Sequence, residues 1–134
     1  MPEKTTLERA QRDAREGKAP TTQAGEFVRE EMEHIRGGKH GARSTKQAIA
    51  IGLSKARRAG VKLKPPAKGK ASAKTRKQSE RDYRKGQSPS RRRPSSRRSL
   101  ATSRALKREG HSAASHNALS KQARSAAQRR KKAA

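Results

Sequence analysis

The chain has 134 residues, of which 28% are apolar and 36% charged, with 37 Lys or Arg against 11 Asp or Glu and a net charge of +26. So few apolar residues at so high a charge are typical of chains that cannot bury enough surface to offset the loss of chain entropy. The composition argues against a stable, independent core, and the absence of cysteine excludes disulfides and thiolate chemistry.

The charges are unevenly distributed along the chain. Eight of the eleven carboxylates lie between Glu3 and Glu33, whereas residues 34–79 contain no acid and fourteen bases. A segment of that charge density gains most from a polyanion, because each neutralised phosphate releases condensed counterions. The sequence therefore predicts nucleic acid as the partner.

The first element is expected at residues 1–20, as a frayed acidic helix. Thr5 and Glu8 fit a capping box, and Gly17 with Pro20 would end the helix near residue 16. Its apolar positions are only Leu7 and two alanines, so it has little to bury. We expect it to fray.

Residues 21–64 are predicted to form a helical hairpin. Ala24, Phe27, Val28, Met32 and Ile35 share one helical face, and Gly37-Gly38 ends that helix. The opposite face would carry Glu26, Glu30 and Glu33. A second capping box, Ser44 with Gln47, begins a helix to residue 59, with Ile49 and Leu53 on its apolar face and Arg57 and Arg58 on its basic one.

The remaining chain is predicted as a disordered basic linker at 65–111 and a basic, Ala-rich helix at 112–134. The linker is rich in Lys, Ser, Arg and Pro without helical periodicity. The alanines of residues 112–134 favour a helix, but that helix has no apolar face to pack on a core. The predicted fold is thus mainly α with extensive disorder: a hairpin, a basic tail and a C-terminal helix.

Two stretches carry a family resemblance: GARSTKQAIAIGLSKARRAG, residues 41–60, and GEFVREEMEH, residues 25–34. Together they resemble a family of small basic bacterial proteins of unknown function that are often labelled DNA-binding. The resemblance covers residues 25–64 and implies a bacterial, cytoplasmic protein that binds nucleic acid. It transfers no residue-level role.

The helix beginning at Ser44 offers free amides and a positive dipole end beside three bases, which suits a backbone phosphate. The Ser/Arg tract and the basic C-terminus could wrap nucleic acid by charge alone. The predicted nucleic-acid-binding residues are Lys39, Arg43, Lys46, Arg57, Arg58, Lys62, Lys64, Arg91, Arg92, Arg93, Arg97, Arg98, Arg129, Arg130, Lys131 and Lys132.

Other chemistry finds little support in the sequence. His34 and His40 straddle a Gly-rich loop and His111 and His116 are five residues apart, so we expect no metal site and no cofactor. No nucleotide-binding or nucleophile motif is present, which predicts that the chain is not an enzyme and has no small-molecule substrate. The basic half lacks the apolar face of a membrane-surface helix, so membrane binding is not expected.

The predicted function is sequence-nonspecific binding of double-stranded DNA, as an accessory protein of the nucleoid in the cytoplasm. Phe27 and Tyr83 are the only aromatic residues, too few for the stacking platforms that bind single strands. RNA remains an alternative, as for a ribosome-associated protein. A second alternative is a protein-interaction module, a hairpin that forms a homodimer through its apolar face and is localised by its basic tail.

Overall fold

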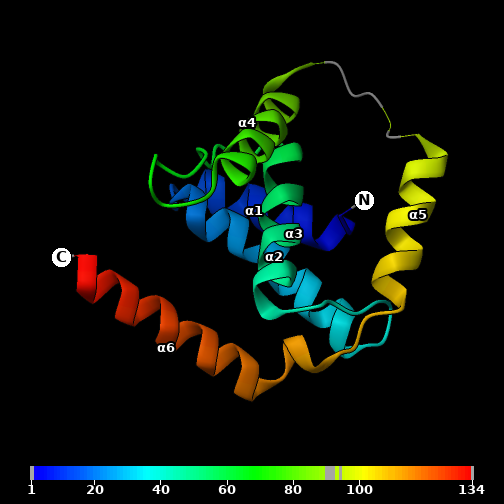
Figure 1. Cartoon of the computed structure of the whole chain (residues 1–134). Coiled ribbons are helices and arrows are strands. Elements are labelled where there is room, and N and C mark those ends of the chain that lie inside the picture. The colour runs from blue at the N-terminus through cyan, green and yellow to red at the C-terminus, as the bar shows by residue number, and fades with distance from the viewer. Residues whose placement is uncertain (1, 90–92, 94, 134) are drawn as a thin grey trace. The chain divides into compact units, whose positions relative to one another are not determined.

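The computed structural model describes residues 2–89, 93 and 95–133, and these form six α-helices and one 3₁₀ turn (Figure 1). The helices are α1 (Lys4–Arg15), α2 (Pro20–Arg36), α3 (Thr45–Arg58), α4 (Ala73–Gln87), α5 (Ser96–Lys107) and α6 (His116–Ala133), and the turn η1 is Ser112–Ala114. Internal contacts divide the chain into two compact units. The first is Met1–Glu30 with Ala50–Arg93, and the second is Glu31–Ile49 with Pro94–Ala134.

The core of the first unit is built mostly from small residues around Phe27. Ala10, Ala24, Ala56 and Val61 are buried with it, and four partly buried apolar side chains pack on them, namely Leu7, Leu53, Ala59 and Leu63. Small side chains let helices approach closely. A Cβ added at Gly52 would lie 2.7 Å from the Cα of Val28, so α3 meets α2 backbone to backbone. Close packing therefore makes a core where bulky residues are few.

Helix α1 belongs to this core. Ala10 is buried, Leu7 packs against the cluster, and the amide of Glu3 donates to Oε1 of Glu30 at 2.5 Å. The expected Thr5 cap is wrong, because α1 begins at Lys4 after Glu3, which makes no side-chain capping bond. The predicted lack of buried surface is also wrong, since Thr6, Ala10 and Asp13 are buried and Ala10 belongs to the cluster around Phe27.

The prediction of extensive disorder is wrong at residues 73–87 and 96–107, which form α4 and α5. The amide of Thr75 bonds to the Ser72 side chain and that of Arg98 to Ser95, which begins each helix with a serine cap. No proline interrupts residues 73–87. The small number of apolar residues in this segment did not predict α4, because that helix packs on α3 through polar groups.

Asp82 is the centre of the contact between α4 and α3. Its carboxylate is almost fully buried and accepts hydrogen bonds from Ser54 Oγ at 2.6 Å, Arg58 Nε at 2.9 Å and Gln78 Nε2 at 3.1 Å. Near the end of α4, a Cβ added at Gly86 would lie 1.7 Å from the carbonyl oxygen of Arg57. A paired carboxylate and a glycine thus hold α4 on α3.

Replacing Asp82 with asparagine should lower the free energy of unfolding by about 1–3 kcal/mol, because the buried amide cannot accept all three hydrogen bonds and Arg58 loses its counter-charge. Urea unfolding followed by circular dichroism measures the change. Glu80→Gln is the matched control on the same helix. Glu80 forms an exposed pair with Arg84, and its loss should cost less than about 0.5 kcal/mol. Equal effects of the two changes would contradict the structural role of Asp82.

In the second unit, the loop after α2 is held by the segment before α6. The amides of Gly41 and Ala42 donate to the carbonyls of Leu106 and Gly110, at 2.9 and 3.0 Å. Two side chains extend this contact: Thr45 Oγ1 donates to Ala113 O at 2.7 Å and Arg36 Nε to Ala114 O at 2.9 Å. Ala113 and Ala114 are buried as a result.

Helix α6 occupies the stretch where the sequence predicts an Ala-rich helix, and like α5 it buries none of its described residues. Both helices therefore depend on local propensity and capping rather than on a core. Among the residues described, no helix combines the length and the apolar character needed to cross a bilayer.

Candidate nucleic-acid interface

In the described part of the chain, several acids are buried, whereas most bases are exposed. Four of the eleven carboxylates are buried, those of Asp13, Glu30, Glu31 and Asp82. Among the described Lys and Arg residues, Arg57 alone is buried. Buried acids still lower the net charge, but they cannot stand directly opposite an approaching phosphate. The surface is thus more uniformly basic than the sequence suggests.

This result corrects the expected acidic face of α2. Glu30 was placed on the outer face, but it is 2% exposed and bonds to the amide of Glu3. Glu26 is partly buried, and only Glu33 of the three is exposed. The three carboxylates therefore do not form a continuous acidic surface.

Arg57 was expected on the basic outer face of α3, and this placement is wrong. The side chain is buried and donates to the carbonyls of Leu63 and Lys64, at 3.1 and 3.3 Å, and to Ser79 Oγ at 3.4 Å. Burial lowers the pKa of the Arg57 guanidinium, and the nearby Asp82 carboxylate opposes that shift. The guanidinium links the 59–64 segment and α4 to α3, so Arg57 is not part of the candidate interface.

Arg58 lies at the surface, with about half of its side chain exposed, but it forms an ion pair with Asp82 at 2.9 Å. Lys62 and Lys64 follow it in the same unit and are exposed. Part of the Arg58 charge is therefore already neutralised. The two lysines are better placed to meet a phosphate.

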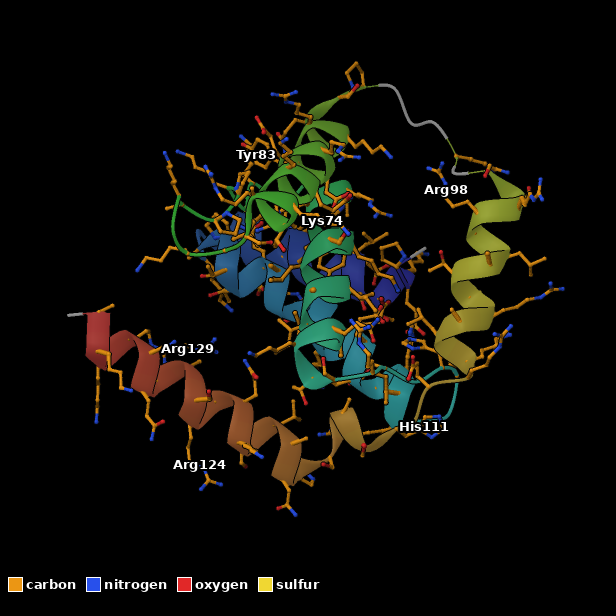
Figure 2. All side chains as sticks on the ribbon, in the orientation of Figure 1. Lys74, Tyr83, Arg98, His111, Arg124 and Arg129 are labelled. Carbon is orange, nitrogen blue, oxygen red and sulfur yellow. The ribbon has the colours of Figure 1, made fainter. Side chains whose placement is uncertain are left out.

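A basic stripe on α4 was missed by the sequence prediction. Lys74, Lys77, Arg81 and Lys85 fall within about 80° of arc at the helical spacing of 100° per residue, and all four are exposed. Figure 2 shows Lys74 on this helix. We name these four residues the α4 stripe. Its signal in the sequence was a base at i, i+3, i+7 and i+11 after the Ser72 cap.

The N-terminus of α3 is capped as predicted. The amide of Gln47 donates to Ser44 Oγ at 3.1 Å, and Gln47 Oε1 accepts from the amide of Arg43 at 2.6 Å. Ser44, Thr45 and Lys46 line a groove together with residues of α6, among them Lys121. The second unit thus brings another base to this helix end, where the dipole already favours an anion.

Helix α6 exposes bases along its length. Lys121 and Arg124 lie on one face with the amides of Asn117 and Gln128, around a shallow depression. The predicted residues Arg129 to Lys132 lie in its last turn and are exposed, and Figure 2 labels Arg129 on α6. Because four consecutive helical residues point in four directions, these bases surround the helix end instead of forming one face.

The other predicted residues are placed as follows. Lys39 and Arg43 are exposed on the α2–α3 loop, Arg97 and Arg98 are exposed in the first turn of α5, and Arg93 is exposed before it. Arg91 and Arg92 lie outside the described residues. The structure gathers Lys46 with Lys121 in the second unit and Arg58 with the α4 helix in the first.

Residues 22–68 match a family of unknown function (DUF6496). No curated protein and no solved structure matches the chain. The matched segment is about a third of the sequence and contains nearly all of α2, the Gly-rich loop, α3 and the 59–64 segment that Arg57 contacts. It includes Arg43, Lys46 and Arg58, whereas the α4 stripe and α6 lie outside it.

Proposed function

We propose that the chain binds double-stranded DNA without sequence specificity, through contacts to the phosphate backbone. The observation that carries this proposal is the separation of charge: four of the eleven acids are buried, while bases line the exposed faces of α4 and α6. The α4 stripe runs from Lys74 to Lys85, eleven steps along the helix, or about 16 Å at 1.5 Å per residue. B-DNA carries a phosphate charge about every 1.7 Å of its axis, so such a stripe can meet several phosphates.

The side chains on these faces favour backbone contact over base reading. The stripe consists of lysines and one arginine, and its neighbours do not form the paired amides that read adenine in the major groove. Phe27 is fully buried and Tyr83 partly buried, which removes the aromatic residues from a stacking role. We therefore infer binding that follows charge and shape, as in an accessory protein of the bacterial nucleoid.

The alternative of a dimerising hairpin loses support. Phe27, Met32 and Ile35, which would form the docking face, are buried within the chain itself. RNA remains the second candidate, because the exposed bases would meet an A-form backbone by the same physics.

The affinity for duplex DNA should fall steeply with salt. If about eight phosphates are engaged, log K against log salt has a slope near −7. Fluorescence anisotropy with a labelled duplex measures this slope, a scrambled duplex tests specificity, and a structured RNA competitor tests the alternative. A slope of about −2 or shallower, or a tenfold preference for one sequence, would contradict the proposal. Stronger competition by RNA would favour the second candidate.

A further inference from the structure

Two histidines and a carboxylate converge at the end of α2, which the sequence did not predict. Glu31 and His34 are three residues apart on the helix and so share a face. His40 Nε2 lies 3.1 Å from Oε2 of Glu31, and the centroids of the two imidazole rings are 5.9 Å apart. One potential ligand atom from each of the three residues lies within 4.8 Å of the others.

The turn after α2 explains how His40 reaches this position. The amides of Gly38 and Lys39 donate to the carbonyls of Ile35 and His34, at 3.2 and 3.0 Å, and Gly38 has a φ of +79°. This is the pattern of a Schellman motif, which a residue with positive φ closes and which reverses the chain. The next residue, His40, therefore returns toward the last turns of α2.

The backbone also orients the His40 ring. Its Nδ1 lies 2.9 Å from the carbonyl oxygen of Gly41, and a proton on Nδ1 donates to that oxygen. In this tautomer the lone pair of Nε2 points toward Glu31. Metal-binding histidines are commonly held in this way, with one ring nitrogen bonded to a carbonyl and the other directed at the ion.

We propose that Glu31, His34 and His40 bind a Zn²⁺ ion. Two imidazoles and one carboxylate are a zinc ligand set that leaves a fourth position to water. Ligand atoms in a tetrahedral site with bonds of about 2.0–2.1 Å lie about 3.3 Å apart. The cluster must therefore contract by at most about 1.5 Å, and rotation of the two partly exposed histidines provides this movement.

Burial of Glu31 favours the same assignment. Its side chain is 0% exposed, and a carboxylate in such a place requires a cationic partner or donors. In the metal-bound state the ion places positive charge beside this carboxylate. The ion would also tie α2 to the loop that Leu106 and Gly110 hold.

The test uses the untagged, full-length chain, freed of metal by a chelator and then titrated with Zn²⁺ by calorimetry in a buffer without phosphate. We expect one ion per chain. His34→Gln and His40→Gln should each weaken binding by about tenfold or more, because even the loss of a residue that only hydrogen-bonds to a metal ligand costs about 10–100-fold. The double variant His111→Gln, His116→Gln is the matched control and should bind as the unaltered chain does.

Because Glu31→Gln alters a fully buried group, its circular dichroism must match the unaltered chain before its affinity is compared. A second measurement needs no variant: imidazole ¹⁵N resonances report which histidines bind the ion. Zn²⁺ should shift the resonances of His34 and His40 and leave those of His111 and His116 in place. Absence of binding, unchanged affinity in the His34 and His40 variants, or shifts confined to His111 and His116 would overturn the proposal.

Discussion

Gly86→Ala is expected to lower the free energy of unfolding by about 1–3 kcal/mol, the usual cost of forcing an extra carbon into a packed contact. The new Cβ would lie 1.7 Å from the carbonyl oxygen of Arg57, so α4 must move off α3. In an isolated helix the same change would raise helicity, because alanine is the better helix former by about 1 kcal/mol. The sign of the effect therefore reports whether α4 is docked. Thermal and urea unfolding, monitored by circular dichroism, measure it.

Gly25→Ala is the matched control for this change. Gly25 also lies inside a helix, but a Cβ there meets nothing within 4 Å. It should raise the free energy of unfolding by about 0.5–1 kcal/mol through the helix propensity of alanine. Stabilisation by both substitutions would show that residues 73–87 behave as an unpacked helix and would refute the contact between α4 and α3.

Local signals in the sequence were sufficient for the α2–α3 part of the fold. Gly37-Gly38 ends α2, the Ser44 and Gln47 side chains cap α3, and the apolar face of α2 is buried at Phe27, Met32 and Ile35. Each of these features is decided by residues within one or two helical turns. Periodicity and capping patterns are made by residues this close together in the sequence, so they predict such features directly.

The contacts of α4 depend on residues far apart in the sequence. Asp82 is buried only because Ser54 and Arg58 face it from α3, and Gly86 matters only because the Arg57 carbonyl is opposite. A polar helix with these partners has no apolar stripe, so its composition resembles that of a linker. For the same reason Arg57 was assigned to the surface although it is buried.

The residues of the candidate sites also differ in whether the sequence predicts them. Exposed bases such as Lys46 and Lys62 were identifiable from charge alone, because a base without a nearby acid is rarely buried. The Glu31, His34 and His40 cluster was not, because its third member arrives through a turn whose path the residue spacing does not reveal. The positive φ of Gly38 and the bonds of Lys39 and Gly41 create that path.

Removing three charges from the α4 stripe should weaken DNA binding strongly. In the variant Lys77→Gln, Arg81→Gln, Lys85→Gln, three phosphate contacts are lost, and the slope of log K against log salt should become shallower by about 2.7. At about 0.1 M salt this corresponds to a loss of affinity on the order of several hundredfold. Glutamine has a helix propensity similar to those of lysine and arginine, so α4 should remain folded.

The control removes the same charge from α1, as Lys4→Gln, Arg12→Gln, Arg15→Gln. These three bases are also exposed, but they share their helix with Glu8 and Asp13 and are followed by Glu16. If binding followed net charge alone, both variants would lose affinity equally, because both carry three fewer charges. Contact through the stripe predicts instead that the α1 variant keeps nearly the whole salt slope and most of its affinity at each salt concentration. Equal losses would place the DNA elsewhere and leave α4 as a helix whose bases are only solvated.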